Sequence, residues 1–309
     1  MIFTQSLYLD APNLREADAI VLGRTAEGGI ILDRSIFAPA QSGYPGDSGR
    51  LAWSIAKPYG PPERMETIIA TTLRSEGRAP ILLSAEPYAL PPLGARVVQH
   101  LDWERRHRLM RMHTALHLLS ITLPRPVLGA KIGAKSSWIE LGDLPETAHA
   151  RVVAPVDISE LEAGMNRLVA MQLPVASLWK GREVAPSLAP IYAHLTRESL
   201  GPSTRVPATV DETQARGGVG LLRARSEHVT RAQHALRLVR IGAQDAPLDV
   251  QPCAGPHVSN TAEIGRIHVQ IKRAAQISRA EDERSADHLR GFGRLKTGET
   301  SLRLWISLA

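Results

Sequence analysis

Short apolar runs separated by glycine and proline dominate the first hundred residues. The runs are Ala19–Leu22, Gly29–Leu32, Thr67–Ala70, Ile81–Leu83 and Ala95–Val98. The stretch from Gly23 to Gly28 gives the first two runs the spacing of a hairpin, and glycines and prolines between Pro39 and Gly49 mark a long loop. Many short strands without helical periodicity predict a small β-barrel, which we place at residues 1–98.

The pattern changes at Asp102, where apolar residues begin to recur at helical spacing. Residues 104–121 contain no Gly or Pro, and one face carries Leu109, Met112, Leu116 and Leu119. Asp102 is suited to cap this helix, and an acidic residue follows in its first turn. We expect Arg105, Arg106 and Arg108 to lie in its early, solvated turns.

Further elements follow along the chain. The apolar spacing of residues 158–171 predicts a second helix. Apolar and polar residues alternate over 236–241, as in a half-buried strand, and residues 264–271 are a second strand candidate. The fold class we predict is α+β: an N-terminal small β-barrel followed, over residues 99–278, by an antiparallel-sheet domain with packed helices. Residues 201–233 show no period and predict an insertion. Residues 279–309 allow a helix, an edge strand or a tail.

Composition narrows the class of protein only a little. The 37 basic and 31 acidic residues among 309 give a net charge of +6. This charge, carried mostly by arginine, agrees with a nucleic-acid partner or with a GC-rich genome, which favours Arg codons. One cysteine excludes a disulfide within the chain. The first residues do not resemble a secretory signal, and no apolar run is long enough to span a membrane. We therefore expect a cytoplasmic protein.

Four residues have the spacing of metal ligands. His113 and His117 are one turn apart on the predicted helix, so their imidazoles share a face. Cys253 and His257 are also four apart, in a turn rich in proline and glycine. Three imidazoles and one thiolate suit zinc. The alternative is that the histidines are polar residues of a core-facing helix, bonded to the backbone.

Other catalytic motifs are missing from the sequence. No Glu follows the first His of the pair, so the helix is not that of the His-Glu-x-x-His metalloproteases. No Gly-x-Ser-x-Gly motif indicates a serine hydrolase, and no glycine-rich phosphate loop indicates a nucleotide site.

Three stretches together resemble the alanyl-tRNA editing proteins of the AlaX family, which are similar to the editing domain of alanyl-tRNA synthetase. They are Leu101–Leu119 with the His-x-x-x-His pair, Val239–Gly265 with the Cys-x-x-x-His pair, and Val21–Leu51 with Pro45-Gly46-Asp47-Ser48-Gly49. The resemblance implies zinc held by His113, His117, Cys253 and His257, and it keeps Asp249 and Gln251 as catalytic candidates beside the metal.

The implied function is the hydrolysis, in trans, of the ester in tRNA for alanine that carries serine or glycine. The implied partner is tRNA, contacted mainly through arginines such as Arg105, Arg106 and Arg108, with no membrane and no obligate protein partner. Four protein ligands close a tetrahedron, however, which is typical of structural zinc.

This chain departs from the family pattern near the implied substrate pocket. The family's Gly-Gly-Gly-Gln is replaced by Gln41-Ser42-Gly43-Tyr44, Pro256 replaces Thr, and Lys131 replaces a common Gln. Tyr44, Lys131 and Pro256 are therefore the candidate substrate-binding positions. The departures favour a second hypothesis, a relative that binds zinc and tRNA with little hydrolysis. An unrelated metallohydrolase is a third, which the family motifs disfavour.

Overall fold

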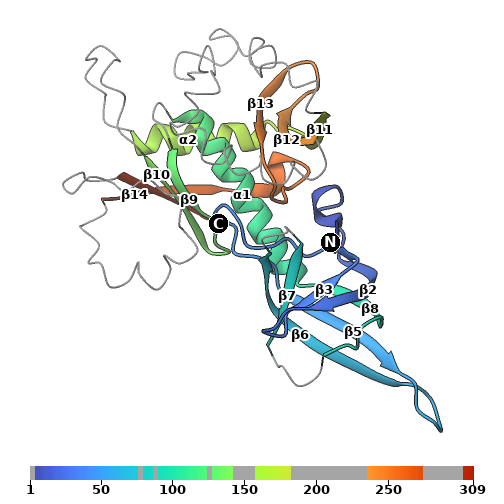
Figure 1. Ribbon diagram of the computed structural model, residues 1–309. Coiled ribbons are helices and arrows are strands. Elements are labelled where there is room, and N and C mark those ends of the chain that lie inside the picture. Colours follow the sequence, from blue (N-terminus) through green and yellow to red (C-terminus); the bar gives the residue numbers. More distant parts are fainter. Residues whose placement is uncertain are drawn as a thin grey trace.

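The computed structural model describes residues 4–75, 79–85, 90–123, 127–141, 157–181, 235–273 and 302–309. The predicted insertion at 201–233 and residues 279–301 lie outside the described residues. Figure 1 shows two parts, a strand-built part at one end and a mixed helix and sheet part at the other, with α1 (Trp103–Thr122) running from the first into the second.

The first part is a closed antiparallel barrel, as the many short apolar runs predict. Its strands, in spatial order, are β2 (Glu16–Arg24), β3 (Ile30–Leu32), β7 (Pro80–Ser84), β6 (Glu63–Arg74), β5 (Gly49–Ile55) and β8 (Arg96–Leu101). Its core is apolar and includes Ile30, Leu51, Ile69 and Leu82, each fully buried. Beside it, β1 (Gln5–Ser6) pairs in parallel with β4 (Arg34–Ser35), and a short 3-10 helix, η1 (Leu7–Leu9), follows β1.

The second part packs two sheets around α1. One sheet has the order β14 (Ile267–Arg273), β15 (Leu302–Leu308), β10 (Ser136–Leu141), β9 (Val127–Lys131). The other is β11 (Val175–Gly181), β12 (Ala235–Gly242), β13 (Pro247–Pro252). The remaining elements are α2 (Ile158–Ala170), which packs on β14, and the 3-10 helix η3 (Thr261–Ile264). The α+β class is confirmed.

Local signals position α1 accurately. The Asp102 side chain accepts a hydrogen bond of 3.2 Å from the backbone N–H of Arg105, as expected of an N-cap. From Leu109 onward nearly every side chain of α1 is buried, because the helix is covered by a sheet on one side and by α2 and η3 on others. His113 and His117, which lie in this buried stretch, therefore point into the interior.

The sequence alone does not decide the structure of the last segment, which forms a strand. Leu302–Leu308 forms β15, which pairs antiparallel with β14 on one side and with β10 on the other. It is thus an interior strand of the sheet, neither the helix nor the edge strand that the sequence allowed. Leu304 and Ile306 are buried toward α1, which explains the alternation in this segment.

Candidate metal centre

Helix α1 supplies two of the four predicted ligands. His113 and His117 are 3% and 0% exposed, and their ring centroids lie 5.1 Å apart at an angle of 71°. One helical turn separates the residues, so both rings lie over the same stretch of helix. The geometry thus agrees with the prediction that these two imidazoles share one face of the helix.

The turn after β13 supplies the other two ligands. Cys253 and His257 are each 4% exposed, and the turn between them passes directly over the ring of His113. A Cβ added at Gly255 would lie 2.4 Å from Cε1 of His113. Only glycine allows this approach, so Gly255 determines how closely the turn sits on the helix.

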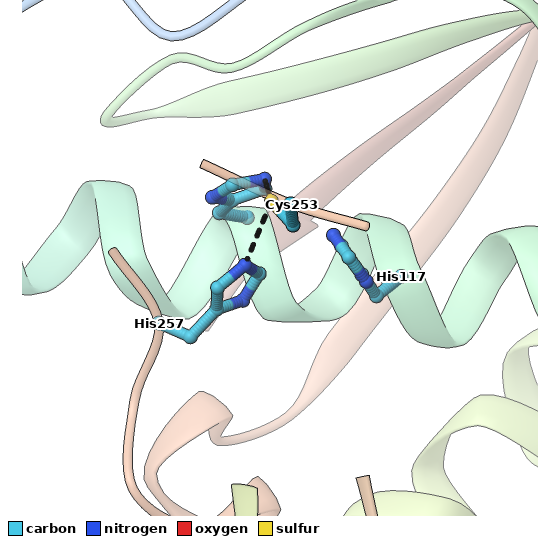
Figure 2. A group of neighbouring side chains, drawn as sticks. His117, Cys253 and His257 are labelled. Atoms are coloured by element: carbon cyan, nitrogen blue, oxygen red, sulfur yellow. Dashed lines mark hydrogen bonds between the residues drawn. The ribbon is translucent and has the colours of Figure 1, made fainter. Parts of the chain in front are cut away.

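The four side chains converge on one point. Their ligand atoms all lie within 4.8 Å of one another. The Cys253 Sγ is 3.4 Å from Nε2 of His113 and 3.3 Å from Nε2 of His257. Figure 2 shows the side chains of His117, Cys253 and His257 directed toward one another beside α1. Ligand atoms of a tetrahedral zinc site are about 3.5 Å apart, given the usual Zn–S and Zn–N lengths.

The second ring nitrogens test whether these residues fit a metal. His113 Nδ1 donates to the Pro256 carbonyl at 3.1 Å. His257 Nδ1 donates to the Thr114 hydroxyl at 3.1 Å, and that hydroxyl donates to the Met110 carbonyl. Both histidines therefore turn Nε2 toward Cys253, the arrangement in which an outer partner fixes the ligating tautomer.

The ring nitrogens of His117 are a second test of whether these residues fit a metal. Its two ring nitrogens are buried, and neither has a hydrogen-bond partner among the described residues. Its Nδ1 lies 3.9 Å from Oδ2 of Asp249, an ion-pair distance too long for a hydrogen bond. Leaving both nitrogens without partners costs free energy, and a bound metal would remove part of that cost. The residues present thus fit a metal such as zinc.

The lowered pKa values of Cys253 and His257 favour cation binding, whereas the raised pKa of His117 opposes it. Burial alone would raise the pKa of the Cys253 thiol, but the imidazoles of His113 and His257 outweigh it and hold the pKa well below its usual range. Burial and the neighbouring His113 lower the pKa of His257. Burial also lowers the pKa of His117, but Asp249 and Cys253 reverse this and raise it to about 9. A metal would therefore meet a thiolate and displace a proton from His117.

The two catalytic candidates lie beside His117. Asp249 and Gln251 are on β13 and are 7% and 2% exposed. Gln251 Nε2 donates to Oδ2 of Asp249 at 2.5 Å and to the Ser120 hydroxyl at 3.4 Å. The other amide atom of Gln251, Oε1, is buried and has no hydrogen-bond partner among the described residues.

The candidate substrate positions occupy different surroundings. Tyr44 is 3% exposed, and its hydroxyl donates to Oδ1 of Asp47 at 2.7 Å, while its ring lies 6.3 Å from that of His113. Pro256 is buried and contributes its carbonyl to His113. Lys131 is exposed at the end of β9, and the structure gives it no contact with the cluster. The first two are thus brought to the cluster and the third is not.

One of the arginines expected at the surface is buried. Arg106 has a fully buried side chain that pairs with Asp47 and also donates to the carbonyls of Pro12 and Ile36. The expectation of a solvated Arg106 is wrong, because its partner lies 59 residues earlier in a barrel loop. Arg105 is half-buried and donates to the Gly46 carbonyl at 2.6 Å, and Arg108 remains exposed.

Arg237 is a buried residue that sequence reasoning missed. It is 1% exposed and donates to the carbonyls of Cys253 at 2.7 Å and Gly255 at 3.1 Å. It also donates to the Leu9 carbonyl and to the Ser177 hydroxyl. Alternation along β12 places Arg237 on the face opposite that of the buried Leu238, so the pattern predicts exposure. In fact both faces of β12 are covered, and Arg237 holds the turn that carries two candidate ligands.

The fold and the cluster together define the class: a closed barrel joined to a sheet domain with a candidate metal centre in its interior. Residues 236–290 match the family of the threonyl and alanyl tRNA synthetase second additional domain. Among the described residues, no helix is long and apolar enough to cross a membrane.

Individual proteins with similar sequences give a more specific relationship than the family model does. The chain is 31% identical to the alanine–tRNA ligase of Pyrobaculum arsenaticum over 88% of this chain and 26% of that protein. It is 29% identical to that of Methanoculleus marisnigri over 86% of this chain and 24% of that protein. The chain thus spans about a quarter of the length of these curated relatives. These similarities support the resemblance that its motifs predict, to an AlaX-like relative of the alanyl-tRNA synthetase editing region.

Proposed function

We propose that this protein is a trans-acting deacylase that hydrolyses the ester of tRNA for alanine mischarged with serine or glycine. The observation that carries the proposal is a buried cluster formed by His113, His117, Cys253 and His257. Hydrogen bonds orient the imidazoles of His113 and His257 in this cluster. The chain is also related to alanine–tRNA ligases. Zinc is the proposed cofactor, tRNA the proposed partner and the cytoplasm the proposed location.

The reaction adds water to the ester carbonyl, breaks the bond to the ribose oxygen and returns a proton to that oxygen. A bound zinc ion would supply a Lewis acid to polarise the carbonyl or acidify a water. Asp249 would hold the imidazole of His117 in place. The Gln251 amide, fixed by its bond to Asp249, offers its unpartnered Oε1 to accept a hydrogen bond from water or from the substrate's ammonium group. Aminoacyl esters are activated, so modest positioning suffices.

A second candidate function is binding of zinc and tRNA with little hydrolysis. Two observations favour it. Four protein ligand atoms fill a tetrahedral shell, which is typical of structural zinc. In addition, Tyr44, which stands where the family has an amide, is buried and bonded to Asp47. If hydrogen bonds to the substrate are lost in this way, the rate falls by roughly 30- to 1000-fold.

Deacylation under single-turnover conditions separates the two functions. Ser-tRNA for alanine, Gly-tRNA for alanine and the correctly charged Ala-tRNA are each incubated with the full chain, with the Gln251→Leu variant and with the exposed control Gln270→Ala. We expect slow loss of the serine or glycine ester, a tenfold or greater reduction in Gln251→Leu and no change in the control. Zinc-loaded protein that binds these tRNAs but leaves every ester intact would establish the second function, and a chain that neither binds nor hydrolyses them would exclude both.

The proposed contact with tRNA is electrostatic. Exposed Arg108 is a candidate phosphate contact, whereas buried Arg106 is not. Each phosphate contact releases counterions, so affinity for tRNA should fall steeply as salt rises. Arg108→Ala should weaken binding and reduce the salt slope by about 1. An affinity that is constant between low and physiological salt would contradict this part of the proposal.

A further inference from the structure

The loop that departs from the family pattern forms a tight turn pressed against the second part of the molecule. Gln41 and Tyr44 exchange backbone hydrogen bonds of 3.0 and 2.7 Å, and both central residues have left-handed φ values, 46° at Ser42 and 84° at Gly43. The Gly43 carbonyl accepts from the Ile132 N–H at 2.9 Å. A Cβ at Gly43 would lie 2.3 Å from the Ala130 carbonyl oxygen, so the turn is held closely beside β9.

From this fixed turn, the side chain of Gln41 connects the barrel to the turn that carries Cys253. Its Oε1 accepts a hydrogen bond of 2.6 Å from Nη1 of Arg74, at the end of barrel strand β6. Its Nε2 donates at 3.0 Å to the carbonyl of Ala254, the residue next to Cys253. One planar amide therefore spans the two parts.

The bond from Gln41 completes a pattern along the ligand turn. Four consecutive carbonyls, those of Cys253, Ala254, Gly255 and Pro256, each accept a hydrogen bond from a side chain. The donors are Arg237 for Cys253 and Gly255, Gln41 for Ala254, and His113 for Pro256. The turn has no regular secondary structure, so these donors determine where the Cys253 sulfur lies.

We propose that Gln41 is a positioning residue for the metal centre, acting from the barrel through the Ala254 carbonyl on Cys253. This inference rests on the proposed metal site. Loss of the Gln41 donor should leave the four ligands in place but allow the turn to move, so that the metal is held less tightly and in a less regular geometry.

Cobalt substitution gives a readout that does not depend on deacylation. The full chain, Gln41→Glu, Gln41→Ala and the control Gln270→Ala are loaded with Co²⁺, and the visible d–d bands and the thiolate-to-cobalt band are recorded. Gln41→Glu preserves the acceptor for Arg74 but removes the donor to Ala254. We expect altered bands in both Gln41 variants and transfer of metal to a chelator about 10- to 100-fold faster, with the control unchanged.

The outcomes of this experiment test the role of Gln41 independently of the proposed deacylase function. Both Gln41 variants with wild-type bands and wild-type release rates would overturn it, as would a wild-type chain that binds no Co²⁺ or Zn²⁺. A lower melting temperature with unchanged bands would mean a merely structural role and would also overturn it. If the bands and rates change as expected in a protein that never hydrolyses Ser-tRNA, the proposed function fails and the role of Gln41 stands.

Discussion

The barrel core and the candidate metal centre are both buried, but the first is built mainly of apolar side chains and the second of polar ones. The barrel interior consists mainly of aliphatic and aromatic side chains whose contacts are non-directional, with a few buried polar residues such as Gln99. The centre consists of histidines, a cysteine, an aspartate and a buried arginine. Directed hydrogen bonds between distant parts of the chain fix His113, His257 and the turn that carries Cys253. The barrel should therefore tolerate changes that conserve volume, whereas the centre depends on individual donors and acceptors.

The largest effect is expected at Cys253. Cys253→Ala removes the single thiolate from the cluster, so the purified variant should retain less than about a tenth of one zinc equivalent, whereas the unchanged chain holds about one. Metal analysis after dialysis measures both. Full zinc retention in the variant would exclude Cys253 from the site.

Arg106 tests the ion pair that links the barrel loop to α1. Arg106→Met leaves the buried Asp47 carboxylate without its cation and should reduce the free energy of unfolding by about 3–5 kcal/mol. Denaturant unfolding measures the loss. The control is the double variant Arg106→Met/Asp47→Asn, which removes both charges and should recover part of it. A single variant as stable as the unchanged chain would show that the pair does not join the two parts.

A change in the barrel core should affect stability without affecting the metal. Leu82 is fully buried among aliphatic residues, so Leu82→Ala should cost about 2–5 kcal/mol of unfolding free energy. Because Leu82 lies on β7 and belongs to the separate barrel core, zinc content should stay at about one equivalent. Zinc loss in proportion to destabilisation would mean that the two regions are not independent.

The sequence predicts the elements of this fold better than it predicts their long-range partners. The barrel strands follow from short apolar runs between turn residues, and α1 follows from helical spacing and the Asp102 cap; all of these are local signals. The ligand pairs also have local spacings, so all four could be named. Arg106 and Arg237 could not be placed, because their burial depends on Asp47 and on carbonyls that only the folded chain brings near. The pairing of β15 with β10 is long-range for the same reason.

The predicted division of the chain at residues 98 and 278 remains a prediction, although the structure adds one fact that bears on it. Strand β15 lies beyond residue 278 yet completes the sheet that covers α1. A fragment that ends at 278 would lack an interior strand. The family model matches residues 236–290 and therefore does not include this closing strand.

The central claim is that His113, His117, Cys253 and His257 form one metal site. X-ray absorption at the zinc edge of the purified full chain tests it most directly, because the spectrum reports the ligand atoms themselves. The structure predicts one sulfur near 2.3 Å and three imidazole nitrogens near 2.0–2.1 Å. A shell without sulfur, or one composed mainly of oxygen, would contradict the claim.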